Sequence, residues 1–174
     1  MPPYENFTDY ALIDAINQGD TSAFEGLYDR YANKVLKRCY FICLNVETAR
    51  DLMQEVWIKV FLHLHTFKKQ SAFSSWLYRL ATNHCLNYLK SKAHAELSTE
   101  DTVFREASQE ESTSGIEVQH LLQKLSLEDR TILAMKFMGE YTYEEIAVIC
   151  KIGVSATKMR VSRLITKLRD EVYS

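Results

Sequence analysis

The stretch YTYEEIAVICKIGVSATKMRVSRLITKLR, residues 141–169, decides the fold of the C-terminal third of this chain. Thr142 and Glu145 have the spacing of a capping box, which predicts the start of a short helix. Gly153 suits the turn that follows, because glycine tolerates positive φ, and a second helix is expected over residues 155–169. Two helices joined by a tight turn predict a helix-turn-helix, whose second helix fits the major groove of DNA. The alternative is a helical hairpin with a solvated basic face.

The second helix of this motif carries polar and basic side chains on its outer side. The side chains expected to face outward, toward base edges, are Ser155, Lys158, Met159, Ser162 and Arg163. Arg160, Arg163 and Lys167 are expected to meet phosphates, which position a helix without reading the base sequence.

Positive charge is concentrated in two windows of a chain whose formal net charge is only −2. Residues 56–95 and residues 146–169 contain Lys and Arg but no Asp or Glu. A single window of this kind is usually a solvated face. Two windows with an acidic stretch between them favour binding to a polyanion.

The first window contains FKKQSAFSSWLYRLATNHCLNYLKSK, residues 67–92, which combines aromatic rings with positive charge. Unstacked bases regain stacking on aromatic faces, so this combination favours a single-stranded nucleic acid. Phe73, Trp76 and Tyr88 could instead be core residues at helical spacing. The polar side chains that have no core role, and so favour nucleic-acid binding, are Lys68, Lys69, Arg79 and Asn83.

The chain is predicted to be all-α, because its 174 residues include only 5 Gly and 2 Pro and show no strand pattern. We expect two small helical domains, residues 1–92 and 116–174. Residues 93–115 are acidic, rich in Ser and Thr and poor in apolar side chains, so they are expected to form a flexible linker.

Helix starts in the rest of the chain are expected at Asp20 or Ser22, at Asn45 and at Ser126. Ser22 with Glu25 and Ser126 with Asp129 have the spacing of a capping box. The helix after Asn45 becomes apolar nearly all round beyond Val56, where Trp57, Ile58, Phe61 and Leu62 occur. Such a helix is either buried in a bundle or covered by a partner.

Several functional classes are disfavoured by the sequence. The four Cys include no C-x-x-C pair, so we expect structural thiols, with no metal site and no cofactor. No His stands with a nucleophile or a phosphate-binding glycine loop, so an enzyme with catalytic residues and a small-molecule substrate is not expected. No apolar run is long enough for membrane insertion and no signal peptide is visible, so a cytoplasmic protein is expected.

Several segments occur together in the order typical of one protein family. They are AFEGLYDRYANKVLKRCY (23–40), ARDLMQEVWIKVF (49–61), SAFSSWLYRLATNHCLNYL (71–89), LSLEDRTILAMKF (125–137) and the helix-turn-helix. With them the chain resembles the extracytoplasmic-function (ECF) group of bacterial RNA polymerase sigma factors, in the sigma-70 family, over almost its full length. The resemblance implies a protein that binds core RNA polymerase, directs it to promoters and helps to melt the minus-ten region.

The resemblance also implies a role for particular residues. Those expected to bind the clamp of the polymerase β′ subunit are Asp51, Gln54, Glu55, Trp57 and Ile58. Those expected at the minus-ten DNA are Phe67, Lys68, Lys69, Phe73, Trp76, Arg79, Asn83, Asn87 and Lys90, with residues 67–73 holding a flipped base. Those expected at the minus-thirty-five DNA are Ser155, Lys158, Met159, Arg160, Ser162, Arg163 and Lys167.

Further partners are implied by the same resemblance, namely the flap of the polymerase β subunit, promoter DNA and an anti-sigma factor. The recognition helix begins Ser155, Ala156, Thr157 where the family usually has Gly-Thr-Val, and Asn87 stands where the family often has Asp. These departures leave the promoter sequence open. The alternative is a stand-alone helix-turn-helix transcription regulator with an N-terminal helical sensor domain, which leaves residues 67–73 and the apolar third helix unexplained.

Overall fold

A computed structural model gives the structure of the chain and describes residues 4–97 and 120–173. Every regular element within those two ranges is a helix, which confirms the all-α prediction. The N-terminal elements are α1 (Asp9–Asn17), α2 (Ala23–Cys43), α3 (Val46–His63), the 3-10 turn η1 (Leu64–Thr66) and α4 (Phe73–Leu97). The C-terminal elements are a helical turn at residues 120–123, α6 (Leu127–Leu133), the π-helical turn η2 (Ala134–Met138), α7 (Tyr143–Cys150) and α8 (Val154–Val172).

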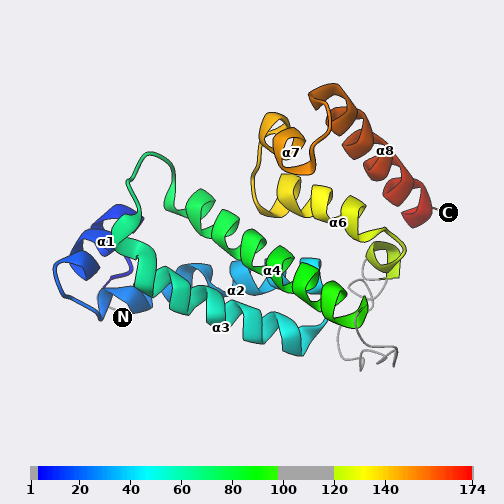
Figure 1. The fold of residues 1–174 in the computed structure, drawn as a ribbon. Coiled ribbons are helices and arrows are strands. Elements are labelled where there is room, and N and C mark those ends of the chain that lie inside the picture. Colours follow the sequence, from blue (N-terminus) through cyan, green and yellow to red (C-terminus); the bar gives the residue numbers. More distant parts are fainter. Residues whose placement is uncertain (1–3, 98–119, 174) are drawn as a thin grey trace.

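The N-terminal elements form a bundle in which α2, α3 and α4 pack side by side, with α1 near the end where α4 begins (Figure 1). Apolar side chains at helical spacing line its centre, and Leu27, Val35, Val56, Val60 and Leu77 are fully buried. Each such burial stabilises the fold by roughly 1.5–3 kcal/mol before the entropy of ordering is counted. The apolar spacing of the sequence therefore accounts for the packing of these helices.

Two helix starts follow the sequence closely. Asn45 accepts a hydrogen bond from the backbone N–H of Thr48 at 2.8 Å and so begins α3. Thr142 and Glu145 form the expected capping box at the start of α7. These side chains satisfy N–H groups that have no partner within their own helix.

The other two expected capping boxes differ from the structure. Ser126 accepts from the backbone N–H of Asp129 at 3.1 Å, but the Asp129 carboxylate binds a side chain of α8. The prediction of a Ser22–Glu25 capping box is wrong, because Ser22 has helical backbone angles and its side chain accepts no capping hydrogen bond. Its hydroxyl instead donates to the carboxylate of Asp20.

The turn of the helix-turn-helix places its left-handed residue earlier than expected. Lys151 has φ of 55° at the end of α7, whereas Gly153 has φ of −71° and begins α8. A left-handed residue commonly ends a helix, and here Lys151 takes that place although glycine suits it better. The expectation of positive φ at Gly153 is therefore wrong, while the helix-turn-helix itself is present.

The C-terminal helices pack against α4, which lies between them and the rest of the N-terminal bundle in Figure 1. One cluster of buried apolar side chains contains residues of both parts, including Leu86 of α4, Met135 of η2 and Ile146 of α7. α4 continues to Leu97, so residues 93–97 of the expected linker belong to this helix. The rest of the linker, with its expected flexibility, lies outside the described residues.

Candidate nucleic-acid interface

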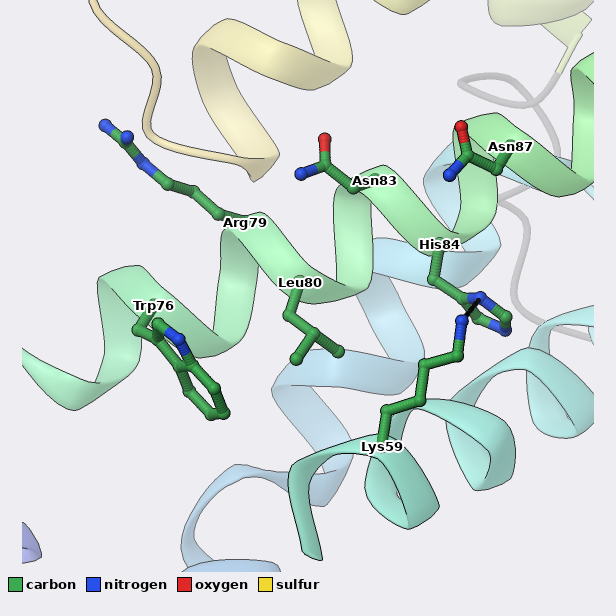
Figure 2. Close-up of a pocket in the computed structure, with 7 residues that line it drawn as sticks. All are labelled: Lys59, Trp76, Arg79, Leu80, Asn83, His84 and Asn87. Atoms are coloured by element: carbon green, nitrogen blue, oxygen red, sulfur yellow. Dashed lines mark hydrogen bonds between the residues drawn. The ribbon is translucent and has the colours of Figure 1, made fainter. Parts of the chain in front are cut away.

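One side of α4 lines an open groove of about 400 Å³, shown in Figure 2. The residues that line it are Lys59 of α3 and, from α4, Trp76, Leu80, His84, Arg79, Asn83 and Asn87. Their spacing of three and four residues places the α4 side chains on neighbouring turns of one helix face. The groove therefore brings together Trp76, Arg79, Asn83 and Asn87, which the sequence predicts to contact minus-ten DNA.

The C-terminal helices occupy part of this face. Arg79 makes two parallel hydrogen bonds to the Glu145 carboxylate, at 2.8 and 2.9 Å, and its guanidinium lies 4.7 Å from the centre of the Tyr141 ring. The Tyr141 hydroxyl donates to the side-chain oxygen of Asn83 at 2.7 Å. The backbone N–H of Thr142 and the Arg79 guanidinium together lower the pKa of Glu145 below its ordinary value. The Arg79 charge is thus matched by an ionised carboxylate of the same chain.

The segment from Met138 to Tyr141 completes this contact. Arg38 of α2 donates to the Met138 carbonyl at 3.0 Å while stacking over the Tyr78 ring at 3.3 Å. Tyr141 is buried, and a Cβ at Gly139 would lie only 2.7 Å from its ring atoms. Since real Cβ atoms essentially never approach so closely, Gly139 is the residue that lets Tyr141 lie against α4.

Residues 67–72 connect η1 to α4 and are called the 67–72 loop. The aromatic rings at and beside this loop are more deeply buried than the sequence suggests. Phe67 is 8% exposed and Phe73 only 1%, so neither ring face is open to a base in this arrangement. Trp76 is half-buried, packs on both rings and lines the groove. Lys68 is exposed, whereas Lys69 pairs with Asp14 of α1. Among these rings, Trp76 is the one that can reach a nucleic acid.

The residues expected at the polymerase clamp divide into two groups. Asp51, Gln54 and Glu55 are exposed on α3, and Ile58 is 60% exposed. Trp57 is only 4% exposed, so it is a core residue and not part of a contact surface.

The burial of Trp57 has a local cause, since its ring packs edge-on against Phe24 and tilted against Tyr28 of α2. Phe61 and Leu62, one turn beyond Ile58, are exposed and extend its apolar surface. Sequence reasoning noticed their apolar character but did not include them among the candidate site residues. The signal that could have found them is the same all-apolar run of α3.

Glu55 is engaged within the bundle. Its carboxylate accepts from His84 Nε2 at 2.6 Å. On the other side of the same ring, Lys59 donates to His84 Nδ1 at 2.8 Å, as Figure 2 shows. Because an ammonium group can only donate, Nδ1 accepts from Lys59 while Nε2 donates to the Glu55 carboxylate. This chain of three side chains joins α3 to the groove face of α4.

The second basic face lies on α8 and is largely open. Its exposed members are Ser155, Lys158, Met159, Ser162, Arg163 and Lys167, with Met159 71% exposed. Arg160 differs, because it binds the carboxylates of Asp129 at 2.7 Å and Glu128 at 3.2 Å on α6. The hydrogen bond to Asp129 raises the pKa of Arg160 above its usual value. Arg160 thus fastens α8 to α6 and is not a free phosphate contact in this structure.

The described residues, 4–97 and 120–173, contain neither a cluster of metal ligands nor a membrane-spanning helix. No group of three or more His, Cys, Asp or Glu side chains in these residues could hold a metal ion. No helix in the same ranges is long and apolar enough to cross a membrane. All four Cys are free thiols, and burial raises the pKa of Cys43 to about 11.

Comparison with known proteins identifies both halves of the chain. The family Sigma-70 region 2 matches residues 27–95, and the family Sigma-70, region 4 matches residues 116–168. The ECF RNA polymerase sigma factor SigW of Bacillus subtilis is 29% identical over 92% of this chain and 94% of that protein. The ECF RNA polymerase sigma-E factor of Escherichia coli (strain K12) is 29% identical over 91% of each chain.

Two solved structures share the fold of this chain. The sigma factor RpoE, in complex with the anti-sigma factor NepR from Bartonella quintana, has a TM-score of 0.64 and 19% identity over 86% of this chain and 96% of that chain. CnrH, in complex with the cytosolic domain of CnrY, has a TM-score of 0.60 and 20% identity over 94% of this chain and 96% of that chain. At these identities the likeness shows the shared fold alone.

Proposed function

The chain belongs to the ECF group of sigma-70 family RNA polymerase sigma factors, and from this premise we propose how its two basic faces divide the work. As a sigma factor it binds core RNA polymerase and promoter DNA. The observation that carries the assignment is the occurrence of sigma-70 regions 2 and 4 in order along the chain. A stand-alone regulator with a sensor domain is not favoured, because the N-terminal half is itself a sigma region.

The N-terminal part, residues 1–92, is proposed to bind the polymerase and the minus-ten DNA. On α4, Trp76 offers a partly open ring and Asn87 and Lys90 offer exposed polar groups. A ring that stacks on an unpaired base contributes roughly 1–3 kcal/mol, which offsets part of the cost of unpairing. The buried rings of Phe67 and Phe73 pack against Trp76 and would hold it in place.

The C-terminal part, residues 116–174, is proposed to bind the minus-thirty-five DNA with α8, and residues 93–115 to act as the linker. Lys158 and Met159 lie on the exposed side of α8, where a helix in the major groove meets base edges. Arg163 and Lys167 are exposed on the same helix and would contact phosphates.

The exposed face of α3 is the proposed contact with the β′ clamp. Ile58, Phe61 and Leu62 are each at least half exposed, and Asp51 and Gln54 offer polar groups beside them. An apolar centre with polar neighbours is the usual composition of a protein interface. The C-terminal part is proposed to meet the β flap.

The proposed DNA contacts require α4 and α7 to separate. The minus-ten and minus-thirty-five elements lie about 25 base pairs apart, roughly 85 Å at 3.4 Å per base pair. In this structure the two parts of the chain touch through Arg79 and Glu145. A chain in this closed arrangement therefore cannot reach both elements at once, and Arg79 and Asn83 would become free only when it opens.

Regulation and location follow from the same proposal. One similar structure is a sigma factor bound to an anti-sigma factor, so an anti-sigma factor is a proposed partner here. The proposed place of action is the cytoplasm, where polymerase and chromosome meet. A sigma factor is a DNA-binding regulator, and the chain is proposed to have no catalytic activity of its own.

Reconstitution with core polymerase tests the proposed function. The complex is incubated with a genomic DNA library, and the transcripts are sequenced from their starts. We expect a small set of start sites that share two upstream elements and are absent with core polymerase alone. Failure of the chain to bind core polymerase, or the same starts with and without it, would contradict the proposal.

A further inference from the structure

We propose that α1 positions the 67–72 loop for the minus-ten DNA, with Tyr10 and Asp14 as the positioning residues. This inference rests on the proposed function of the N-terminal part. α1 spans Asp9–Asn17, whereas the first family match begins only at residue 27, so the comparisons assign α1 no role. The loop has no regular secondary structure, and its shape therefore depends on what it touches.

Tyr10 contacts the loop at both ends. Its ring is stacked on that of Phe67, with centroids 6.3 Å apart, and its hydroxyl donates to the Ser71 carbonyl at 3.1 Å. Phe67 in turn packs against Trp76, with centroids 5.6 Å apart. A continuous series of rings therefore leads from α1 to the side chain that lines the α4 groove.

Asp14 contacts the middle of the loop. Its carboxylate pairs with the ammonium group of Lys69, which lies 5.7 Å from the centre of the Tyr10 ring. Lys69 has φ of 54°, in the left-handed region that residues other than glycine adopt uncommonly. The ion pair and the ring thus hold the residue at which the loop turns.

α1 is itself fixed to the bundle. Asp9 accepts a hydrogen bond from the Tyr31 hydroxyl at 2.6 Å and pairs with Arg30 at 2.5 Å, both on α2. Two residues of α1 itself, Leu12 and Ile13, are fully buried against the bundle. The helix can therefore act as a rigid support on which Tyr10 and Asp14 define the loop.

The first test replaces Tyr10 in the full chain bound to core polymerase. Tyr10→Ala removes both the ring stack and the hydrogen bond, and is expected to reduce permanganate-reactive minus-ten thymines about threefold to tenfold. Tyr10→Phe keeps the stack and is expected to fall between Tyr10→Ala and the unchanged chain. Asn17→Ala, at an exposed position of the same helix, is the matched control and should have no effect.

The second test asks whether Asp14 acts through Lys69. Asp14→Asn and Lys69→Ala are compared alone and together on promoters that differ at single minus-ten bases. If Asp14 orients Lys69, each single variant alters base preference and the double variant equals Lys69→Ala. Additive effects of the two changes would contradict this role, and Asp29→Asn on α2 controls for loss of an exposed carboxylate.

A readout without polymerase separates this inference from the proposed function. The chain has two Trp, and Trp57 is buried, so acrylamide quenching of fluorescence reports mainly on Trp76. Tyr10→Ala is expected to raise the quenching constant of the free protein, and Tyr10→Phe to raise it less. The quenching result does not depend on promoter opening. If no promoter opened, that failure would count against the proposed function and not against the role of Tyr10.

The inference is overturned if the folded Tyr10→Phe and Asp14→Asn variants match the unchanged chain in melting, base preference and quenching. Thermal denaturation establishes that each variant is folded. These two variants carry the decision if Tyr10→Ala does not fold.

Discussion

The basic faces of α4 and α8 differ in how far their polar groups are already bound within the chain. On α4, Arg79 binds the Glu145 carboxylate and Asn83 accepts from the Tyr141 hydroxyl. On α8, Lys158, Ser162 and Arg163 are exposed. Both helices have the charge pattern of nucleic-acid binding and both expose polar groups, but on α4 Arg79 and Asn83 are bound to side chains of the C-terminal part. A charge pattern thus indicates which helices are candidates for binding a polyanion, while internal partners decide which of their polar groups are already bound in the free chain.

The largest expected effect comes from the open face. Lys158→Ala should reduce discrimination among minus-thirty-five sequences by about tenfold, because a direct contact to a base edge is worth roughly 1–3 kcal/mol. Lys167→Ala should instead weaken binding to all DNA sequences alike and reduce the salt dependence of binding, as expected for a phosphate contact. Competition binding with a library of duplexes measures both. If the two variants behave identically, Lys158 does not read bases.

The next effect concerns the covered face. Gly139→Ala places a Cβ against the buried Tyr141 ring and should lower the free energy of unfolding by about 1–3 kcal/mol. Displacement of Tyr141 should also free Asn83 and raise binding of single-stranded minus-ten DNA. Thermal denaturation and fluorescence anisotropy measure these two changes.

Gly153→Ala is the control for this substitution, since a Cβ there meets nothing within 4 Å. Gly153→Ala should lower the free energy of unfolding by less than about 1 kcal/mol, because glycine is preferred over alanine at a helix start. It should leave binding of single strands unchanged. Equal binding by the Gly139→Ala chain and the unchanged chain would show that Tyr141 does not restrict α4.

A smaller effect is expected from the ion pair itself. Glu145→Gln removes the charge that Arg79 binds, while glutamine can still serve in the capping box with Thr142. Single-stranded minus-ten DNA should then bind the free chain about twofold to fivefold more tightly, since a partly exposed pair is worth at most about 1 kcal/mol. Glu144→Gln, its exposed neighbour, is the charge-matched control. Equal gains in both variants would indicate a general charge effect.

The smallest effect concerns pH. The pKa of Glu145 is lower in the folded chain than in the unfolded chain. Its contribution to stability is therefore fully present above the pKa that Glu145 has in the unfolded chain, and is lost as pH falls through the pKa that it has in the folded chain. That window lies below the ordinary glutamate value of 4.5. Energy transfer between labels on α4 and α7 should decrease there in the unchanged chain more than in Glu145→Gln. The same decrease in both would assign the transition to other carboxylates.

Sequence periodicity and capping account for much of the fold. The boundaries of α3 and α7 follow from Asn45 and from the Thr142–Glu145 box, because these signals act over a single helical turn. The same signal failed at Ser22, where Asp20 competes for the hydroxyl. Local patterns predict local structure unless a neighbouring side chain offers another partner.

The candidate site was less predictable, because its state depends on contacts far apart in sequence. Periodicity does not tell a core ring from an exposed one, so Trp57 and Phe73 were expected at contact surfaces although they are buried. Arg160 was expected on phosphates, but its partner Asp129 lies on another helix. The pairing of Arg79 with Glu145 likewise joins distant parts of the chain, and no pattern in one helix indicates it.

The separation of the two basic faces is the most direct test of this account. Fluorescent labels at Ser91 on α4 and Glu144 on α7, both exposed and neither a proposed DNA contact, report the distance by single-molecule energy transfer. We predict high transfer in the free chain and low transfer once the chain, core polymerase and a promoter form a complex with a melted minus-ten region. A melted promoter complex that keeps the transfer efficiency of the free chain would contradict the account.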